Sequence, residues 1–170
     1  PEGTEEVTVS VGLSEVDAGS AEQNRIAEVG DKDFDAVRAE TRMLWANNLG
    51  KVKVEGGSSE RMTIFYTALY HTMVSPNLMS DLDGRYRNHS QEIASAPQGR
   101  RFYSTFSLWD TFRSWNPLQT LINPGLVEDM VFSLLDMYDC DGVLPKWPLG
   151  TSDTGCMIGY HAIPVIADAW

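Results

Sequence analysis

The sequence has little cysteine, no long apolar run and few basic residues. Its two cysteines, Cys140 and Cys156, are too few for a disulfide scaffold and lack the spacing of metal ligands. No apolar stretch approaches the roughly 20 residues that a membrane span needs. The chain carries 13 Lys and Arg against 24 Asp and Glu, a net charge of −11. We therefore expect it to bind neither nucleic acid nor an anionic membrane surface.

The sequence also lacks a signal peptide and an initiating methionine. Its first residues are acidic and polar, unlike the basic and apolar regions of a signal peptide. We therefore expect the chain to begin at an artificial or processing boundary. What is present is 42% hydrophobic residues in a chain of 170. That is enough for a packed core, in one domain or in a piece of a larger one.

One segment near the start predicts a β-strand. Residues 6–13, EVTVSVGL, alternate apolar and polar side chains, as a half-buried strand does. No second strand of comparable quality is evident. Because a lone strand cannot pair its backbone groups, we expect its partner strands to lie outside this chain.

The rest of the chain predicts helices joined by polar and aromatic loops. The helical segments combine apolar spacing with start and stop signals. They are residues 33–50, 58–75, 123–142, a short segment opening at Ser107, and a final helix from about Cys156 that is kinked near Pro164. Residues 77–99 are polar and predict a long loop. Sequential helices with rich loops favour an α-helical toroid in which a few helices alone leave apolar faces open.

Two segments carry the residues that could bind a sugar. In FYSTFSLWDTFRSWNPLQTL, residues 102–121, Trp109 stands beside Asp110, with Arg113 one turn later. Aromatic faces stack on sugar rings, and carboxylates and Arg bond hydroxyls. The alternative is that Trp109 packs in the core, Asp110 completes a capping box with Ser107, and Asp110 and Arg113 form a local ion pair.

The second segment is LPKWPLGTSDTGCMIGYH, residues 144–161. Pro and Gly hold a loop around Trp147, and small polar residues precede a predicted helix start, whose N–H groups favour oxygen-rich ligands. His161 is expected one turn into that helix, as a ligand-binding residue or a hydrogen-bonded core histidine. Cys156 would be a nucleophile only with a base beside it, and the sequence shows none.

A third segment, SDLDGRY at residues 80–86, has two carboxylates and a glycine. It is a weak match to a calcium loop and lacks that loop's distal Glu. An Asx-type turn is the better interpretation.

Three ordered segments together resemble glycoside hydrolase family 92, the calcium-dependent exo-acting α-mannosidases found mainly in bacteria. They are FYTALYHTMVSPNLMSDLDGRY, YSTFSLWDTFRSWNPLQTL and GVLPKWPLGTSDTGCMIGYHAIPVIADAW. The resemblance implies a mainly α fold: the opening helices of an (α/α)6 toroid, preceded by one strand of a β-sandwich. The implied divisions are 1–24 for the last strand and exit of the sandwich, 25–57 for a linker helix region, and 58–170 for an incomplete catalytic domain.

The resemblance also implies an inverting hydrolysis of terminal α-linked mannose from glycans. In that reaction one carboxylic acid protonates the leaving oxygen and a carboxylate activates water. The catalytic acid and base and the main calcium ligands are expected beyond Trp170, so the fragment alone is expected to be inactive. Asp110 is carried over as a binder of mannose hydroxyls. The remaining expected binding or supporting residues are Trp109, Arg113, Trp147, Cys156 and His161.

One departure from the family concerns the stretch before Cys156. A Glu is expected there, and the nearest acidic residue is Asp153. The implied partners are a mannose-containing glycan and the remainder of the chain's own polypeptide, and the implied location is periplasmic or extracellular. Two alternatives stay open: a non-catalytic carbohydrate-binding or scaffold module, and another (α/α)6 carbohydrate enzyme such as a glycoside phosphorylase.

Overall fold

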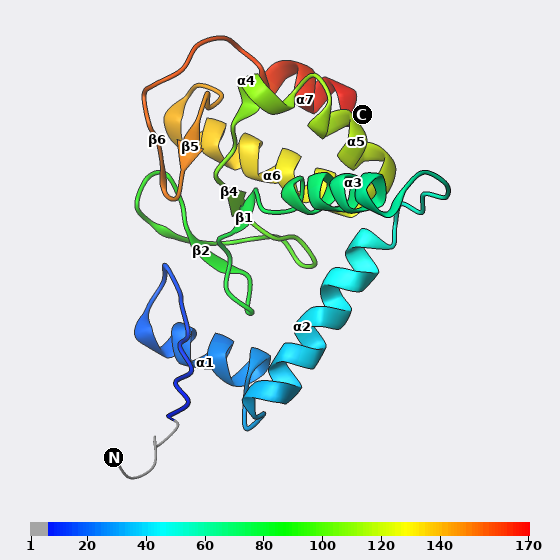
Figure 1. Ribbon diagram of the computed structural model, residues 1–170. Coiled ribbons are helices and arrows are strands. Elements are labelled where there is room, and N and C mark those ends of the chain that lie inside the picture. Colours follow the sequence, from blue (N-terminus) through cyan, green and yellow to red (C-terminus); the bar gives the residue numbers. More distant parts are fainter. Residues whose placement is uncertain (1–6) are drawn as a thin grey trace.

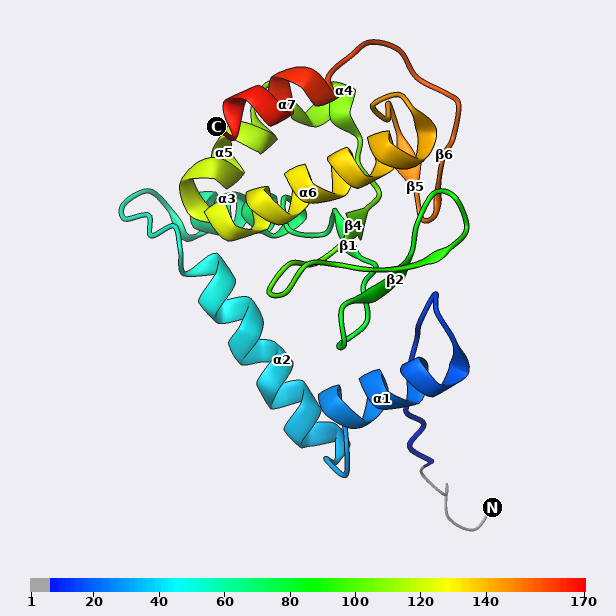
Figure 2. The ribbon, with the colours of Figure 1, turned by 180° about the vertical axis from the view of Figure 1, so that it is seen from behind.

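The computed structural model describes residues 7–170, which form a mainly helical chain with a bent N-terminal arm (Figures 1 and 2). The arm consists of α1 (Ala18–Glu28) and α2 (Phe34–Leu49). The rest packs above it as α3 (Ser59–His71), α4 (Leu108–Thr111), α5 (Trp115–Ile122), α6 (Pro124–Asp141) and α7 (Ala162–Asp168). Among the described residues, none of the helices is long and apolar enough to cross a membrane.

The ends of the longer helices follow the predicted capping signals. The side chain of Asp33 accepts a hydrogen bond from the backbone N–H of Ala36 at the start of α2. Ser58 does the same for Arg61 at the start of α3. Gly142 ends α6 in the left-handed region, at φ 72°, where glycine is favoured. These three helix predictions are confirmed.

Three antiparallel pairs of short strands connect the helices, and the sequence did not predict them. The strand β1 (Asn77–Leu78) pairs with β4 (Tyr103–Ser104), β2 (Arg85–Arg87) with β3 (Ile93–Ser95), and β5 (Pro148–Leu149) with β6 (Ser152–Asp153). The long loop predicted at residues 77–99 is therefore interrupted by three of these strands, β1, β2 and β3. Strands of two or three residues are too short to show alternation, so the polar composition hid them.

The strand predicted at residues 6–13 stays a prediction, because its partner strands are expected outside this chain. Glu6 lies outside the described residues, and residues 7–13 have no hydrogen-bonded strand partner in the described chain. The side chains of Val7, Val9, Val11 and Leu13 are each more than 70% exposed. The apolar alternation is present, but a strand exists only where another strand accepts its backbone hydrogen bonds.

The final helix begins six residues later than predicted. Residues 154–161 form a loop, and α7 starts at Ala162. Met157 and Gly159 both have positive φ in this loop, which interrupts helical geometry before His161. A helix starting at Cys156 is therefore wrong.

The segment SDLDGRY forms the predicted turn. The side chain of Asp83 accepts a hydrogen bond from the N–H of Arg85 two residues later, which defines an Asx turn. Asp81 is buried and accepts hydrogen bonds from Ser14 at 2.6 Å and Asn24 at 2.7 Å. Asp81 thereby fixes α1 to the loop between β1 and β2.

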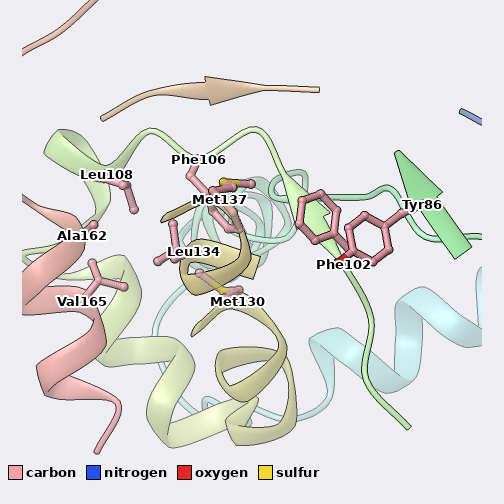
Figure 3. Close-up of a cluster of buried hydrophobic side chains, with 9 residues drawn as sticks. All are labelled: Tyr86, Phe102, Phe106, Leu108, Met130, Leu134, Met137, Ala162 and Val165. Carbon is pink, nitrogen blue, oxygen red and sulfur yellow. The ribbon is translucent and has the colours of Figure 1, made fainter. Parts of the chain in front are cut away.

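The hydrophobic core lies along α6. Met130, Leu134 and Met137 of this helix are almost fully buried, between Phe102 and Tyr86 on one side and a group from α4 and α7 on the other (Figure 3). The rings of Tyr86 and Phe102 stack 4.1 Å apart, at 8° to each other. The other members of the cluster are Phe106, Leu108, Ala162 and Val165.

The apolar side of α2 remains open. The helix contains no buried residue, and Phe34, Met43 and Leu44 are each more than 60% exposed. The expectation that part of a helical ring leaves apolar faces uncovered agrees with this surface.

The central position of Leu134 predicts a large stability effect. We expect Leu134→Ala to lower the free energy of unfolding by about 2–5 kcal/mol, because the removed atoms leave a cavity in a packed core. Urea unfolding followed by tryptophan fluorescence measures this change. The matched control is Leu121→Ala, whose side chain is 82% exposed and whose effect should stay within about 0.5 kcal/mol. Equal losses in the two variants would contradict the position of the core.

Candidate substrate-binding site

One hydroxyl group joins the two segments that carry tryptophan. Ser107, just before α4, donates its Oγ hydrogen to Oδ2 of Asp110 at 2.5 Å. The same Oγ accepts the indole N–H of Trp147 at 2.9 Å. Because a hydroxyl has a single hydrogen to donate, these bonds fix its orientation and that of both partners. The structure therefore brings Asp110 and Trp147 together through Ser107.

The bonds of Ser107 differ from the predicted capping box. Ser107 occupies the N-cap position of α4, but its side chain makes no capping bond to the helix backbone. The predicted start of the helix is confirmed, and the predicted use of the side chain is wrong. Since the helix has only four residues, it gains little from a cap, and the hydroxyl bonds side chains instead.

Asp110 and Trp109 both face solvent on α4. Trp109 is 40% exposed, so it is not the buried core residue that one interpretation required. Oδ1 of Asp110 has no hydrogen-bond partner among the described residues, while Oδ2 is held by Ser107. A carboxylate with one oriented and one open oxygen can accept hydrogen bonds from two hydroxyls of a ligand. The exposed indole offers an apolar surface next to it.

Arg113 does not pair with Asp110. Within the described chain no ion pair joins them, and the Arg113 guanidinium donates to the backbone carbonyl of Trp109 at 3.4 Å. Its central carbon lies 5.8 Å from the centre of the Phe112 ring. The predicted local ion pair is therefore wrong, because the guanidinium turns back over the helix.

His161 lies directly before α7 and packs on the end of α4. Its ring centre is 4.5 Å from that of Phe112. Gly159 makes room for it: a Cβ at this position would approach a ring carbon of His161 to 2.3 Å. Because Gly159 also has φ +87°, both the close approach and the backbone require glycine. The prediction that His161 lies within a helix is wrong, but the structure brings it next to α4.

Cys156 is exposed on the loop between β6 and α7. Its sulfur lies 2.9 Å from the hydroxyl of Thr154. Within residues 7–170 no histidine or carboxylate bonds this sulfur, so the structure does not activate it as a nucleophile. Among the described residues, Cys156 also makes no hydrogen bond with Asp110 or Trp147.

Asp153 holds the loop that carries Trp147. Its Oδ2 accepts the N–H groups of Lys146 at 2.9 Å and of Trp147 at 3.1 Å, and its Oδ1 accepts that of Gly155 at 2.8 Å. Burial alone would raise the pKa of Asp153, but these backbone hydrogen bonds outweigh it and leave the pKa below its ordinary value of 3.8. The acidic residue singled out in the sequence therefore orients the tryptophan loop.

The structure brings most of the predicted site residues together around α4, while Cys156 lies apart from them and bonds only Thr154. Hydrogen bonds join Asp110, Ser107 and Trp147. The side chains of His161 and Arg113 both lie against the ring of Phe112, at the end of α4. In both views α4 and α7 lie side by side, with the β5–β6 hairpin next to them (Figures 1 and 2). Sequence reasoning missed the roles of Ser107 and Phe112, although the Ser-x-x-Asp spacing did mark the first pair.

The open carboxylate oxygen of Asp110 and the exposed indole of Trp109 are groups that suit a polar ring. Among the described residues, no group of three or more His, Cys, Asp or Glu side chains is placed to hold a metal ion. The expectation that the main calcium ligands lie after Trp170 stays a prediction.

Comparison with known proteins agrees with the family resemblance of the three sequence segments. The sequence pattern of the glycosyl hydrolase family 92 catalytic domain matches residues 20–170. No curated protein matches the sequence.

Among solved structures, the chain is similar to the family GH92 alpha-mannosidase BT3965 from Bacteroides thetaiotaomicron, with 35% identity and a TM-score of 0.84. The match covers 91% of this chain and 21% of that chain. A second structure of that protein is a complex with mannoimidazole. The inverting mannosidase BT2199 from the same organism is 31% identical with a TM-score of 0.86, over 92% of this chain and 21% of that one. The chain thus spans about a fifth of the length of these proteins.

The bonds of Asp153 predict a pH-dependent effect of its removal. Asp153→Asn keeps only one side-chain acceptor oxygen, so at least one of the three backbone N–H groups loses its partner. Because the folded pKa is lowered, the charged form stabilises the fold above the ordinary pKa, and this stabilisation is lost as the pH falls through the folded pKa. We expect wild type to be more stable than the variant at pH 7 and the difference to shrink below about pH 4. Urea unfolding across this pH range measures the difference.

A suitable control is Asp139→Asn, an exposed carboxylate on α6. A difference between wild type and Asp153→Asn that stays constant down to pH 2 would contradict the role of the charged carboxylate.

Proposed function

The chain belongs to glycosyl hydrolase family 92, and we propose that it is the first part of the catalytic domain of an exo-acting α-mannosidase that removes terminal α-linked mannose from glycans. The observation that carries this proposal is the bonded group of Asp110, Ser107 and Trp147 within the matched region. The relative that was solved with mannoimidazole supports a mannose-like ring as the ligand.

In this proposal Asp110 accepts hydrogen bonds from hydroxyls of the terminal mannose. Ser107 holds one carboxylate oxygen, so the other is presented in a fixed direction before the sugar binds. Trp109 supplies an exposed apolar surface beside it. Asp153 keeps the Trp147 loop against Ser107 and acts on the sugar only through that loop.

The chemistry of bond cleavage is assigned to residues after Trp170. We propose an inverting reaction, in which one carboxylic acid protonates the leaving oxygen and a second carboxylate activates water. The described chain contributes binding and orientation to this reaction. Its helices are proposed as the opening part of an (α/α)6 toroid, whose later helices would cover the exposed side of α2. Calcium dependence and a periplasmic or extracellular location are proposed for the whole protein.

The role of Asp110 predicts a loss of activity in the full-length protein. We expect Asp110→Asn to lower kcat/KM for an α-1,2-linked mannobiose by about 10- to 150-fold, because a hydrogen bond to a charged group contributes about 1.5–3 kcal/mol. Mannose release measured over a range of substrate concentrations tests this. The matched control is Asp139→Asn, which should leave kcat/KM within about twofold because this carboxylate lies on the exposed side of α6. Unchanged activity in Asp110→Asn would remove the proposed contact.

The missing catalytic carboxylates predict that the 170-residue chain is inactive by itself. No mannose should be released from the same disaccharide, either with calcium or with a chelator. The full-length protein should release mannose with calcium and lose this activity with the chelator. Turnover by the isolated chain would show that the catalytic groups lie within residues 1–170. Phosphate-dependent cleavage by the full-length protein would instead indicate a phosphorylase, and binding without any turnover would indicate a carbohydrate-binding module.

A further inference from the structure

The turn between β2 and β3 contains a residue in a backbone conformation that its side chain does not favour. Gln91 has φ 65°, in the left-handed region, which glycine and asparagine adopt far more readily than glutamine does. An unfavourable backbone conformation persists only where the surrounding contacts determine it. Gln91 is therefore a position at which a role of the side chain is to be sought.

Hydrogen bonds within the turn hold the backbone of Gln91. Its N–H group donates to the carbonyl of Asn88 at 3.0 Å, and the side chain of Asn88 accepts the N–H of Glu92 at 2.9 Å. The guanidinium of Arg87 donates to the carbonyl of Gln91 at 3.0 Å. Both backbone polar groups of Gln91 are thus bonded, which fixes the point from which its side chain extends.

The same turn is joined to the hydrophobic core through His89. The side chain of His89 is only 1% exposed, and its Nδ1 lies 2.6 Å from a carboxylate oxygen of Asp141, the last residue of α6. Because α6 carries the central core residues, this contact gives the turn a fixed position relative to the core.

From the turn, the side chain of Gln91 reaches the hairpin that directly follows Trp147. Its amide nitrogen donates to the carbonyl of Thr151 at 2.9 Å and to the hydroxyl of the same residue at 3.3 Å. Thr151 lies at the tip of the β5–β6 hairpin, between the paired residues Leu149 and Ser152. In both views this hairpin lies beside the loop that follows β2 (Figures 1 and 2).

From these contacts we infer that Gln91 is a positioning residue for Trp147. Asp153 bonds the base of the hairpin by accepting the N–H of Trp147, and Gln91 bonds its tip. The two contacts keep the indole of Trp147 where it donates to Ser107. The length of the glutamine side chain explains its presence at a position with positive φ. The consequence for mannose binding rests on the proposed function, whereas the positioning of Trp147 does not.

The variant Gln91→Asn in the full-length protein tests the inference. Asparagine tolerates positive φ but is one methylene group shorter, so the turn keeps its backbone and loses the bond to Thr151. Fluorine NMR of the protein labelled with fluorotryptophan follows the indoles, and Trp147→Phe identifies the Trp147 resonance by its absence. We expect Gln91→Asn to shift or broaden this resonance and to leave the unfolding temperature unchanged. It should lower kcat/KM for an α-1,2-linked mannobiose by about two- to tenfold, as for the loss of one hydrogen bond.

The matched control is Gln98→Asn, the same change at an exposed glutamine between β3 and β4, which should alter neither the resonance nor kcat/KM. In the Trp147→Phe background, Gln91→Asn should have no further effect on kcat/KM, because Gln91 acts through Trp147.

The inference is overturned by an unchanged Trp147 resonance in Gln91→Asn, or by an equal loss of kcat/KM with and without Trp147. A resonance that moves while kcat/KM stays the same supports the inference and contradicts instead the proposed part of the Trp147 loop in mannose binding. The resonance decides the role of Gln91 even if the full-length protein releases no mannose.

Discussion

The burial of one face of α6 determines where every neighbouring element lies. Leu134 and Met137 are completely removed from solvent, and an apolar surface of this kind is stable only when other elements cover it. The same helix also fixes polar partners: Ser133 accepts the N–H of Tyr103 in β4 at 2.9 Å, and Asp136 accepts the hydroxyl of Tyr86 in β2 at 2.7 Å. Helix α6 therefore sets both the packing and the register of the short strands around it.

The candidate site around Ser107, which includes Asp110, Trp147 and His161, depends on the packing against α6, although none of these residues belongs to that helix. Leu108 and Ala162, each beside a site residue in sequence, are buried in the α6 cluster. Their burial holds α4 and the start of α7 against the same surface, so Phe112 and His161 meet. The side chains of this candidate site lie on short elements and are thus positioned by apolar neighbours outside the site.

The sequence predicted the long helices well and the irregular segments poorly. Asp33, Ser58 and Gly142 act locally on their own helix ends, so a pattern of a few residues was sufficient to place α2, α3 and α6. The short strands, the loop before α7 and the role of Ser107 depend on contacts between residues far apart in the sequence, such as Ser107 and Trp147, which are 40 positions apart. No local pattern contains that information. For the same reason Asp110 and Trp147 could be named as candidates for binding, a role that stays a prediction, but the sequence could not show that Ser107 connects them.

The exposed valines at the beginning of the described chain affect how the protein can be handled. Val7, Val9 and Val11 are each more than 70% exposed, in a segment whose backbone groups have no strand partner among the described residues. Such a segment is a template for edge-to-edge association between molecules. Shortened versions that keep it should aggregate at high concentration. Versions that start at Ser14 retain the hydrogen bond from Ser14 to Asp81 and lack the exposed valines. Ser14 is therefore the better starting residue for soluble preparations.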